Sequence, residues 1–237
     1  MLGNTITASV SRILFGGLPA GTSAFPKILF VLNAIVSCIA FIAYFHQNFY
    51  AVYGLVTKAR QYAPAVVRHK YAYLICAHDE ETVVGNLIDS IKAQNYPQEL
   101  MRIFVCADNC ADATARIARE RGAVVFERAS SRKGKSYALD DSLKRIMKEY
   151  GEEGFEAVFI FDADNLLDRN YTEEMNKLFD LGFSVATSYR ASKNVGANWV
   201  SAGSSYMFYR ESALIHHSRS LLGVGTVSYT HLTLPTI

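Results

Sequence analysis

The sequence feature that most constrains the fold is the stretch from Val158 to Asp164, which reads VFIFDAD. Its four apolar residues, two of them β-branched, are typical of a strand buried on both faces of a parallel sheet. Asp162 and Asp164 follow at the end where open α/β sheets bind ligands, and carboxylates are ligands that Mg²⁺ and Mn²⁺ prefer. Asp is also a common turn residue, so the pattern alone leaves a metal site and an ordinary turn both open.

Strand and helix patterns alternate along the chain around this stretch. Short apolar runs predict strands at Tyr71–Ala77, Ile103–Ala107, Ala123–Glu127, Ala157–Phe161 and Phe183–Ser188. Apolar stripes at helical spacing predict helices at Glu80–Gln94, Asp112–Arg121, Lys135–Tyr150, Tyr171–Leu181 and Asn198–His217. Strands that alternate with helices of this length predict a mostly parallel α/β sheet flanked by helices.

An apolar segment precedes this pattern. The residues Ile28–Phe45 are almost all apolar, and no Asp, Glu, Lys or Arg occurs between Lys27 and Lys58. As a helix the segment extends about 27 Å, close to the hydrocarbon thickness of a bilayer, and aromatic residues follow it as at a membrane interface. More basic residues lie after it than before it, which predicts a transmembrane helix with the downstream part in the cytoplasm. A signal peptide and a buried core helix are the alternatives.

The composition excludes several classes of protein. The chain has 237 residues, a net charge of +2 and 50% hydrophobic residues, which argues against disorder and against a nucleic-acid-binding surface. Its four cysteines show neither a CxxC pair nor the spacing of a disulfide framework, which favours a reducing compartment.

Polar clusters end three of the predicted strands. AHDEE (Ala77–Glu81) ends the first, CADNCAD (Cys106–Asp112) ends the second and DAD (Asp162–Asp164) ends the fourth. The carboxyl ends of parallel strands lie at one edge of a sheet, so we expect these clusters to converge. Together with the basic loop Arg132–Lys135, they predict a metal-dependent phosphate site.

Each side chain in these clusters also has an ordinary structural interpretation. Asp108 is an acceptor for a nucleobase or ribose, or it caps a turn, although Asp112 is the better N-cap for the next helix. Glu80 is part of the ligand wall or a first-turn carboxylate favoured by the helix dipole. Lys135 contacts a phosphate or is a solvated charge, and His78 is mainly structural because no nucleophile is paired with it.

Four motifs in order resemble the nucleotide-binding half of the family 2 glycosyltransferases. They are AHDEE, VCADNCADAT, GKSYALDDSL and FDADN, and the similarity covers about Tyr71 to Leu222. That resemblance implies the GT-A fold, a Rossmann-like, mostly parallel sheet flanked by helices. The preceding apolar helix suits the membrane-bound branch of the family, whose members act in polysaccharide biosynthesis at the cell membrane.

The resemblance also implies roles for particular residues. The AHDEE turn (Ala77, His78 and Glu80) and Asp108 would hold the uracil and ribose of a nucleotide sugar, which the resemblance implies to be UDP-linked. Lys135 would sit by the pyrophosphate, and Asp162 and Asp164 would bind Mg²⁺ or Mn²⁺ together with the sugar diphosphate. The implied reaction is inverting transfer of the sugar to a saccharide or lipid acceptor.

The chain departs from the family pattern at several positions. Position 78 is His where many members have Tyr, and position 109 is Asn where many have Asp or Gly. Members supply a catalytic base from an acidic motif well beyond the Asp-x-Asp, whereas the only acidic residue after Arg190 is Glu211. The last ten residues, 228–237, resemble foreign sequence. We therefore expect an N-terminal fragment whose catalytic base lies beyond the chain end.

These inferences divide the chain into four parts. We expect a flexible N-terminus over 1–25, a transmembrane helix with an interfacial segment over 26–57, an incomplete GT-A domain over 70–225 and a non-native tail over 228–237. Two other classes remain. A sugar nucleotidyltransferase would need a glycine-rich loop after the first strand, where the first glycine is Gly85. The other remaining class is a non-catalytic membrane protein that keeps only the fold.

Overall fold

The computed structural model describes residues 24–224. They divide into two units, one formed by residues 61–187 and the other by 24–60 together with 188–224. The foreign tail expected at 228–237, and all of the expected flexible N-terminus except Ala24 and Phe25, lie outside the described residues. Those two residues belong to a helix.

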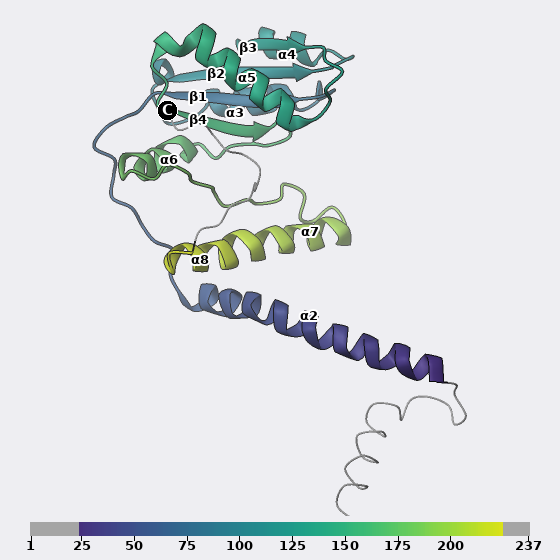
Figure 1. Ribbon diagram of the computed structural model, residues 1–237. Coiled ribbons are helices and arrows are strands. Elements are labelled where there is room, and N and C mark those ends of the chain that lie inside the picture. The colour runs from purple at the N-terminus through teal and green to yellow at the C-terminus, as the bar shows by residue number, and fades with distance from the viewer. Residues whose placement is uncertain (1–23, 225–237) are drawn as a thin grey trace, which may run out of the picture. The chain divides into compact units, whose positions relative to one another are not determined.

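The unit of residues 61–187 contains a four-stranded parallel sheet (Figure 1). Its strands are β1 (Tyr71–Ala77), β2 (Met101–Asp108), β3 (Val124–Arg128) and β4 (Ala157–Asp162), in the spatial order β3-β2-β1-β4. The chain moves outward from β1 to β3 and then returns to place β4 on the other side of β1. Strand order therefore reverses between β1 and β4, which is where sheets of this type bind ligands.

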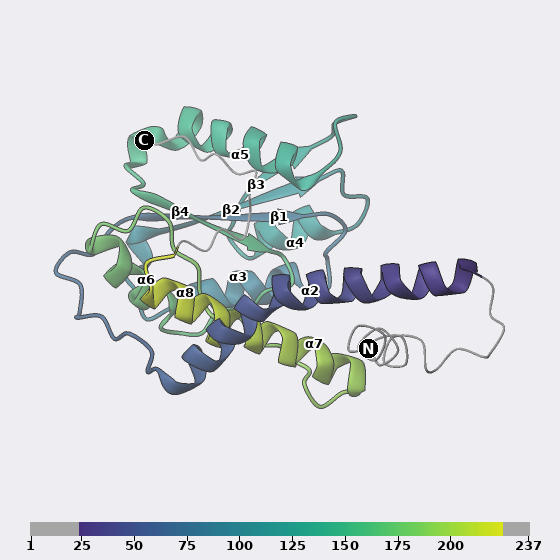
Figure 2. The same cartoon turned by 60° about the horizontal axis from the view of Figure 1, so that its bottom comes forward.

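Helices cover both faces of this sheet. Between the strands the chain forms α3 (Val84–Lys92), α4 (Thr114–Glu120) and α5 (Lys135–Tyr150), with short 3₁₀ turns η1 (Gln98–Leu100) and η2 (Gly151–Glu153), and α6 (Tyr171–Asp180) follows the last strand, β4. Figure 2 shows α5 on one face and α3 and α4 on the other. The mostly parallel α/β sheet flanked by helices is thus confirmed.

Strand β1 lies at the centre because its side chains are buried in both directions. Tyr71, Tyr73 and Ile75 pack against the α3 face, whereas Ala72 and Leu74 pack against the α5 face. A strand that carries apolar side chains at successive positions can be buried on both faces, as the sequence predicts.

The buried amide of Asn176 is hydrogen-bonded through both its oxygen and its nitrogen. The Asn176 side chain is fully buried; its Oδ1 accepts hydrogen bonds from the hydroxyls of Tyr71 (2.7 Å) and Tyr96 (2.9 Å). Its Nδ2 donates to the Val67 carbonyl at 2.8 Å. These bonds fasten α6 to β1 and to the segment that leads into β1.

Most of the predicted elements of this unit are present, but one helix start and one strand need correction. Helix α5 begins and ends where expected, whereas α3 starts at Val84 because the preceding residues form a turn in which Val84 N–H donates to the Glu80 carbonyl. The strand predicted at Phe183–Ser188 is wrong, since this segment has no regular structure. Val185 is 76% exposed there, so its apolar side chain is not packed into a sheet.

The second unit is helical. It contains α2 (Ala24–Val56), α7 (Trp199–Tyr209), the π-helical segment η3 (Arg210–His216) and α8 (His217–Leu221). The expected helix at Asn198–His217 is therefore confirmed, with Asn198 as its N-cap through a 2.9 Å bond from Ser201 N–H.

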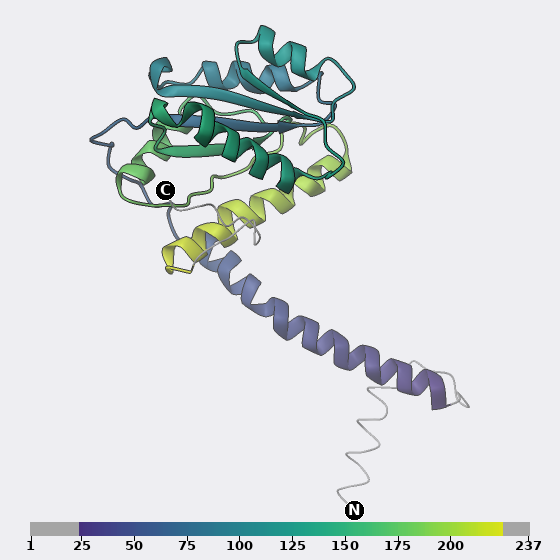
Figure 3. The same cartoon turned by 45° about the horizontal axis from the view of Figure 1, so that its top comes forward.

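Helix α2 is one continuous helix of 33 residues, drawn from purple to blue in Figure 3. It continues eleven residues beyond the predicted end at Phe45, and residues Ile28–Val56 are long and apolar enough to cross a membrane. Near its end it approaches η3 closely, because a Cβ on Gly54 would lie only 2.6 Å from the Leu214 carbonyl oxygen. Ser218 Oγ adds a 2.6 Å hydrogen bond to the Tyr50 carbonyl.

Candidate functional site

A cavity of about 450 Å³ opens at the carboxyl ends of β1, β2 and β4, at the point where strand order reverses. All the residues expected to hold the donor or a metal line it, together with neighbours from the same loops. The lining consists of Cys76, Ala77, His78, Glu80, Asp108, Asn109, Lys133, Gly134, Lys135, Ala138, Asp162, Ala163 and Asp164. The structure thus brings together side chains that are up to 88 residues apart in sequence, Cys76 and Asp164 being the extremes.

The two carboxylates of the Asp-x-Asp lie on either side of a buried residue. Asp162 is the last residue of β4, Ala163 is 3% exposed, and the chain turns with Asn165 N–H donating to the Asp162 carbonyl at 3.1 Å. Burial of Ala163 leaves Asp162 and Asp164 at the cavity wall. A pair of carboxylates beside open space is a donor set that suits Mg²⁺ or Mn²⁺.

The positive side of the cavity comes from the loop before α5. Gly134 has a φ of +125°, a conformation that side-chain-bearing residues rarely adopt, and it directs the chain into the helix at Lys135. The Lys135 ammonium group forms an ion pair with Asp162. The first turn of α5 and Lys133 face the same space, so this wall favours an anion such as a phosphate.

The opposite wall is built from the turn after β1. His78 donates a hydrogen bond from Nδ1 to the Asp108 carbonyl at 2.6 Å, which joins the ends of β1 and β2. The Glu80 backbone N–H donates to Thr114 Oγ1 at 2.8 Å, so the turn is held by the start of α4. His78 therefore has the structural contact expected of it, and its ring also lines the cavity.

Asp108 is anchored by a partner that sequence reasoning missed. Arg128, the last residue of β3, lies opposite Asp108 in the register of the sheet and donates to its Oδ1 at 2.7 Å. Both side chains are nearly buried, at 10% and 13% exposed. Hydrogen bonds from Arg128 to Asp141 and Asp108 raise the pKa of the Arg128 guanidinium, which therefore keeps its charge. The only sequence signal was a basic residue one position beyond the predicted third strand.

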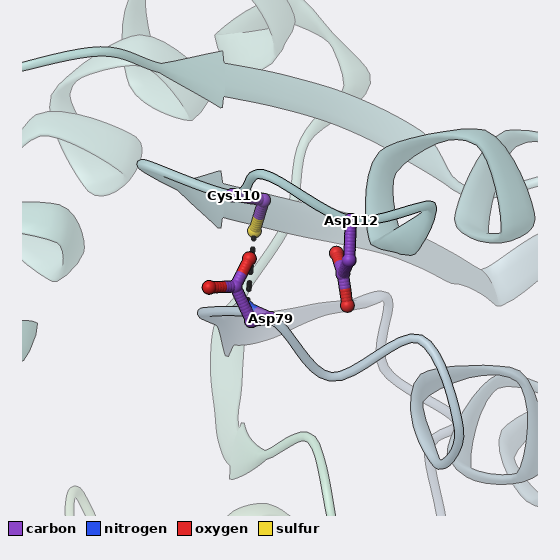
Figure 4. Close-up of side chains that lie close together, drawn as sticks. All are labelled: Asp79, Cys110 and Asp112. Carbon is purple, nitrogen blue, oxygen red and sulfur yellow. Dashed lines mark hydrogen bonds between the residues drawn. The ribbon is translucent and has the colours of Figure 1, made fainter.

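A second group of polar side chains braces the loops behind the cavity (Figure 4). Ligand atoms of Asp79, Cys110 and Asp112 lie within 4.8 Å of one another. The carboxylates accept backbone hydrogen bonds, Asp79 from Ala111 at 2.7 Å and Asp112 from Glu81 at 3.0 Å. These bonds tie the loop after β1 to the loop after β2.

Asp112 does not occupy the N-cap position predicted for it. Helix α4 begins at Thr114, and its N-cap position is Ala113. Asp112 Oδ1 nevertheless accepts the Thr114 backbone N–H at 2.9 Å. Partial burial raises the pKa of this carboxyl, but hydrogen bonds from Thr114 and from backbone N–H groups outweigh that effect and leave the pKa below its ordinary value.

Two cysteines form part of the cavity floor and the core beneath it. Cys76 and Cys106 are partners in the register of β1 and β2. A hydrogen bond between the two thiols, together with burial, raises the pKa of Cys76. The same hydrogen bond lowers the pKa of Cys106 below its ordinary value.

The sequence and the fold have known relatives. Residues 69–232 match the family described as glycosyltransferase like family 2. Over 103 residues the chain is 29% identical to a probable glycosyltransferase, YdaM, of Bacillus subtilis (strain 168), an alignment that covers 40% of this chain and 23% of that protein.

One solved structure shows the same fold. A mannosyltransferase of Pyrobaculum calidifontis, determined in complex with GDP-Man and Mn²⁺, aligns with a TM-score of 0.50 and 22% identity over 68% of this chain and 47% of that chain. TarS of S. aureus in complex with UDP-GlcNAc aligns with a TM-score of 0.40 and 16% identity, over 53% of this chain and 41% of that chain. The chain thus spans less than half the length of the relatives it matches.

Proposed function

The chain belongs to glycosyltransferase-like family 2, and from this premise we propose that its cavity binds a nucleoside diphosphate sugar for transfer to an acceptor. The observation that carries the proposal is the cavity itself. One space at the strand-order reversal is bordered by an anchored acceptor, Asp108, by the cation Lys135 and by the carboxylate pair Asp162 and Asp164. A nucleotide sugar offers the complementary groups in the same order: base and ribose, diphosphate, and metal-bound sugar phosphate.

The nucleoside end would lie against the turn after β1. In this arrangement Ala77, His78 and Glu80 form one wall, and Asp108 accepts hydrogen bonds from the base or ribose. A carboxylate with one oxygen fixed by an arginine keeps a defined orientation, which favours a base edge that donates N–H groups. We propose UDP as the nucleotide, as the resemblance to the family implies. The guanine of GDP-Man, which the solved mannosyltransferase binds, also offers N–H donors.

The diphosphate end would lie between Lys135 and the carboxylates. Lys135 and the first turn of α5 would orient the phosphate oxygens, and Asp162 and Asp164 would hold Mg²⁺ or Mn²⁺. When bound, such a cation acts as a Lewis acid that neutralises the charge of the departing diphosphate. The first turn of α5 would also stabilise negative charge at this position through the helix dipole.

We further propose that transfer inverts the sugar configuration and that the acceptor is a saccharide or lipid at the membrane, as in polysaccharide biosynthesis. Attack by an acceptor hydroxyl requires a general base, which typically contributes 10²–10⁴-fold to the rate. Helix α2 would anchor the protein, with residues 70–225 as a GT-A domain on the cytoplasmic side.

Calorimetry on the full chain in detergent tests this function. UDP-glucose, UDP-GlcNAc and GDP-mannose are titrated with Mn²⁺, with Mg²⁺ and with EDTA. We expect one nucleotide sugar to bind, and EDTA to weaken its binding at least about ten-fold, since a coordinating cation is then lost.

Variants separate the metal role from the nucleotide role. Asp162→Asn and Asp164→Asn should abolish the difference between Mn²⁺ and EDTA, whereas Asp168→Asn, outside the cavity lining, should preserve it. Equal affinity with and without EDTA would disprove the metal role. Failure of all three nucleotide sugars to bind would disprove the proposed function.

A further inference from the structure

We propose that Arg128 is a positioning residue of the donor site, which aligns the base-binding carboxylate with the phosphate-binding loop. The inference rests on the proposed function, because it concerns the same cavity. Arg128 does not line the cavity and acts from behind its wall.

The guanidinium group of Arg128 joins three separate elements. Its Nη1 donates to Asp108 Oδ1 at the end of β2 at 2.7 Å, and its Nε donates to Asp141 Oδ2 on α5 at 2.7 Å. Its Nη2 donates to the backbone carbonyl of Arg132 at 2.9 Å. A strand end, a helix and a loop are therefore fixed by one side chain that is only 10% exposed.

The backbone around Arg128 strengthens this connection. Asn109 N–H donates to the Arg128 carbonyl at 2.7 Å, and the Asn109 side chain accepts from Ser130 N–H at 3.0 Å. Asn109 Nδ2 also donates to Asp108 Oδ1 at 2.9 Å. Several hydrogen bonds thus join the end of β2 to the start of the loop that leads to Lys133 and Lys135.

These contacts require an arginine. The three acceptors lie in different directions, and a planar guanidinium presents N–H groups to all of them at once, whereas a lysine ammonium is a compact charge on a flexible stem. Arg128 holds one carboxylate oxygen of Asp108 and the carbonyl of Arg132, and so sets the position of the nucleoside site relative to the phosphate site.

Asp141 provides the sharpest test, because it touches Arg128 without lining the cavity. Its neighbour Asp140 is a matched control: it lies on the same helix, is similarly exposed (57% against 54%) and pairs with Lys144 instead. We expect Asp141→Asn to weaken UDP binding in the presence of Mn²⁺ by about three- to ten-fold, and Asp140→Asn to leave it unchanged. Calorimetry with UDP on the full chain measures both.

Substitutions of Arg128 test the orientation itself. We expect Arg128→Lys to weaken UDP binding at least about ten-fold although the charge is retained. In a cycle with Asp108→Asn, the double variant should bind little worse than Asp108→Asn alone, because Arg128 acts on the nucleotide through Asp108. Circular dichroism and thermal melting confirm that each variant is folded, and Arg116→Lys, an exposed arginine on α4, is the control.

Limited trypsin digestion of the ligand-free protein gives a readout that does not depend on nucleotide binding. Cleavage after Arg132 should be faster in Arg128→Lys than in the wild-type chain, because the Arg132 carbonyl loses its donor. If UDP fails to bind the wild-type chain but cleavage still accelerates, the proposed function fails and the loop-holding part of the inference stands. Identical UDP affinities for Asp141→Asn and Asp140→Asn, or unchanged cleavage in Arg128→Lys, would overturn the inference.

Discussion

The ammonium group of Lys135 forms an ion pair with the carboxylate of Asp162. The pair joins the first residue of α5 to the last residue of β4, and both residues line the cavity. Without nucleotide, the lysine therefore neutralises part of the negative charge that would attract a divalent cation. A bound diphosphate would supply negative charge for both the cation and the lysine.

Replacing Lys135 should therefore have opposite effects on two ligands. We expect Lys135→Met to tighten Mn²⁺ binding without nucleotide by about two- to five-fold, a modest gain because the ion pair is partly exposed. UDP affinity in the presence of Mn²⁺ should fall about ten-fold, because a charge-assisted contact to phosphate is lost. Electron paramagnetic resonance of free Mn²⁺ and calorimetry with UDP measure the two affinities.

Lys144→Met is the control for this prediction, since Lys144 lies on the exposed side of the same helix and pairs with Asp140. If Lys135→Met weakened Mn²⁺ binding without nucleotide, the lysine would not compete with the cation for Asp162.

The apolar helix predicts a membrane location. We expect α2 to span a bilayer, with the domain that follows it accessible to protease in sealed inside-out vesicles. Placing Lys at both Ile35 and Ile39, which are 52% and 62% exposed, should release the chain on carbonate extraction, because each charge costs about 2.5–3.5 kcal/mol at the centre of a spanning helix. A Val56→Lys change at the helix end should leave the chain in the membrane on carbonate extraction. Protection of the domain in these vesicles would contradict the orientation, and release of the wild-type chain by carbonate would contradict the span.

The buried amide of Asn176 should be essential for stability. Asn176→Ala would leave the hydroxyls of Tyr71 and Tyr96 and the carbonyl of Val67 without their partner, so we expect a loss of about 2–4 kcal/mol in the free energy of unfolding. Urea denaturation followed by circular dichroism measures it. Asn170→Ala, whose side-chain bond to Asn95 is exposed, should cost less than about 1 kcal/mol, and equal losses would contradict the role of the buried network.

The stability of the sheet unit should depend on two carboxylates near His69. His69 contacts Glu156 at 2.8 Å and Asp180 at 3.4 Å. A hydrogen bond from Val66 N–H, the largest influence, lowers the pKa of Asp180 below 3.8. For Glu156, partial burial raises the pKa, but hydrogen bonds from His69 and Lys70 outweigh it and leave the pKa below 4.5.

Because both pKa values are lower in the folded chain than in the unfolded chain, these carboxylates stabilise the fold fully above about pH 4.5. Their contribution is lost as the pH falls through the folded pKa values. We therefore expect the melting temperature to fall below pH 4.5, and to fall less steeply in His69→Gln. If the melting temperature fell equally steeply with pH in both proteins, the His69 contacts would not be what lowers the pKa values of these carboxyl groups.

Local sequence determined much of this protein. The strands β1, β2 and β4 follow from short apolar runs, α5 from its apolar stripe and flanking glycines, and α2 from an uncharged stretch. The candidate site residues were also visible in the sequence, because polar residues that directly follow a buried strand must lie at its carboxyl end. The length of the apolar run and the direction of the chain are enough to predict that placement, even when the order of the strands in the sheet is not known.

Tertiary structure decided the contacts between segments. The register of β2 with β3 sets Arg128 against Asp108, and the return of β4 to the side of β1 brings Asp162 to Lys135. The segment Phe183–Ser188 has strand-like residues but is not part of the sheet, so its apolar pattern was misleading. The residue types in a segment indicate whether it suits a strand or a charged loop. Which residues it contacts, however, depends on which distant segment lies beside it. That choice is made by the packing of the whole unit.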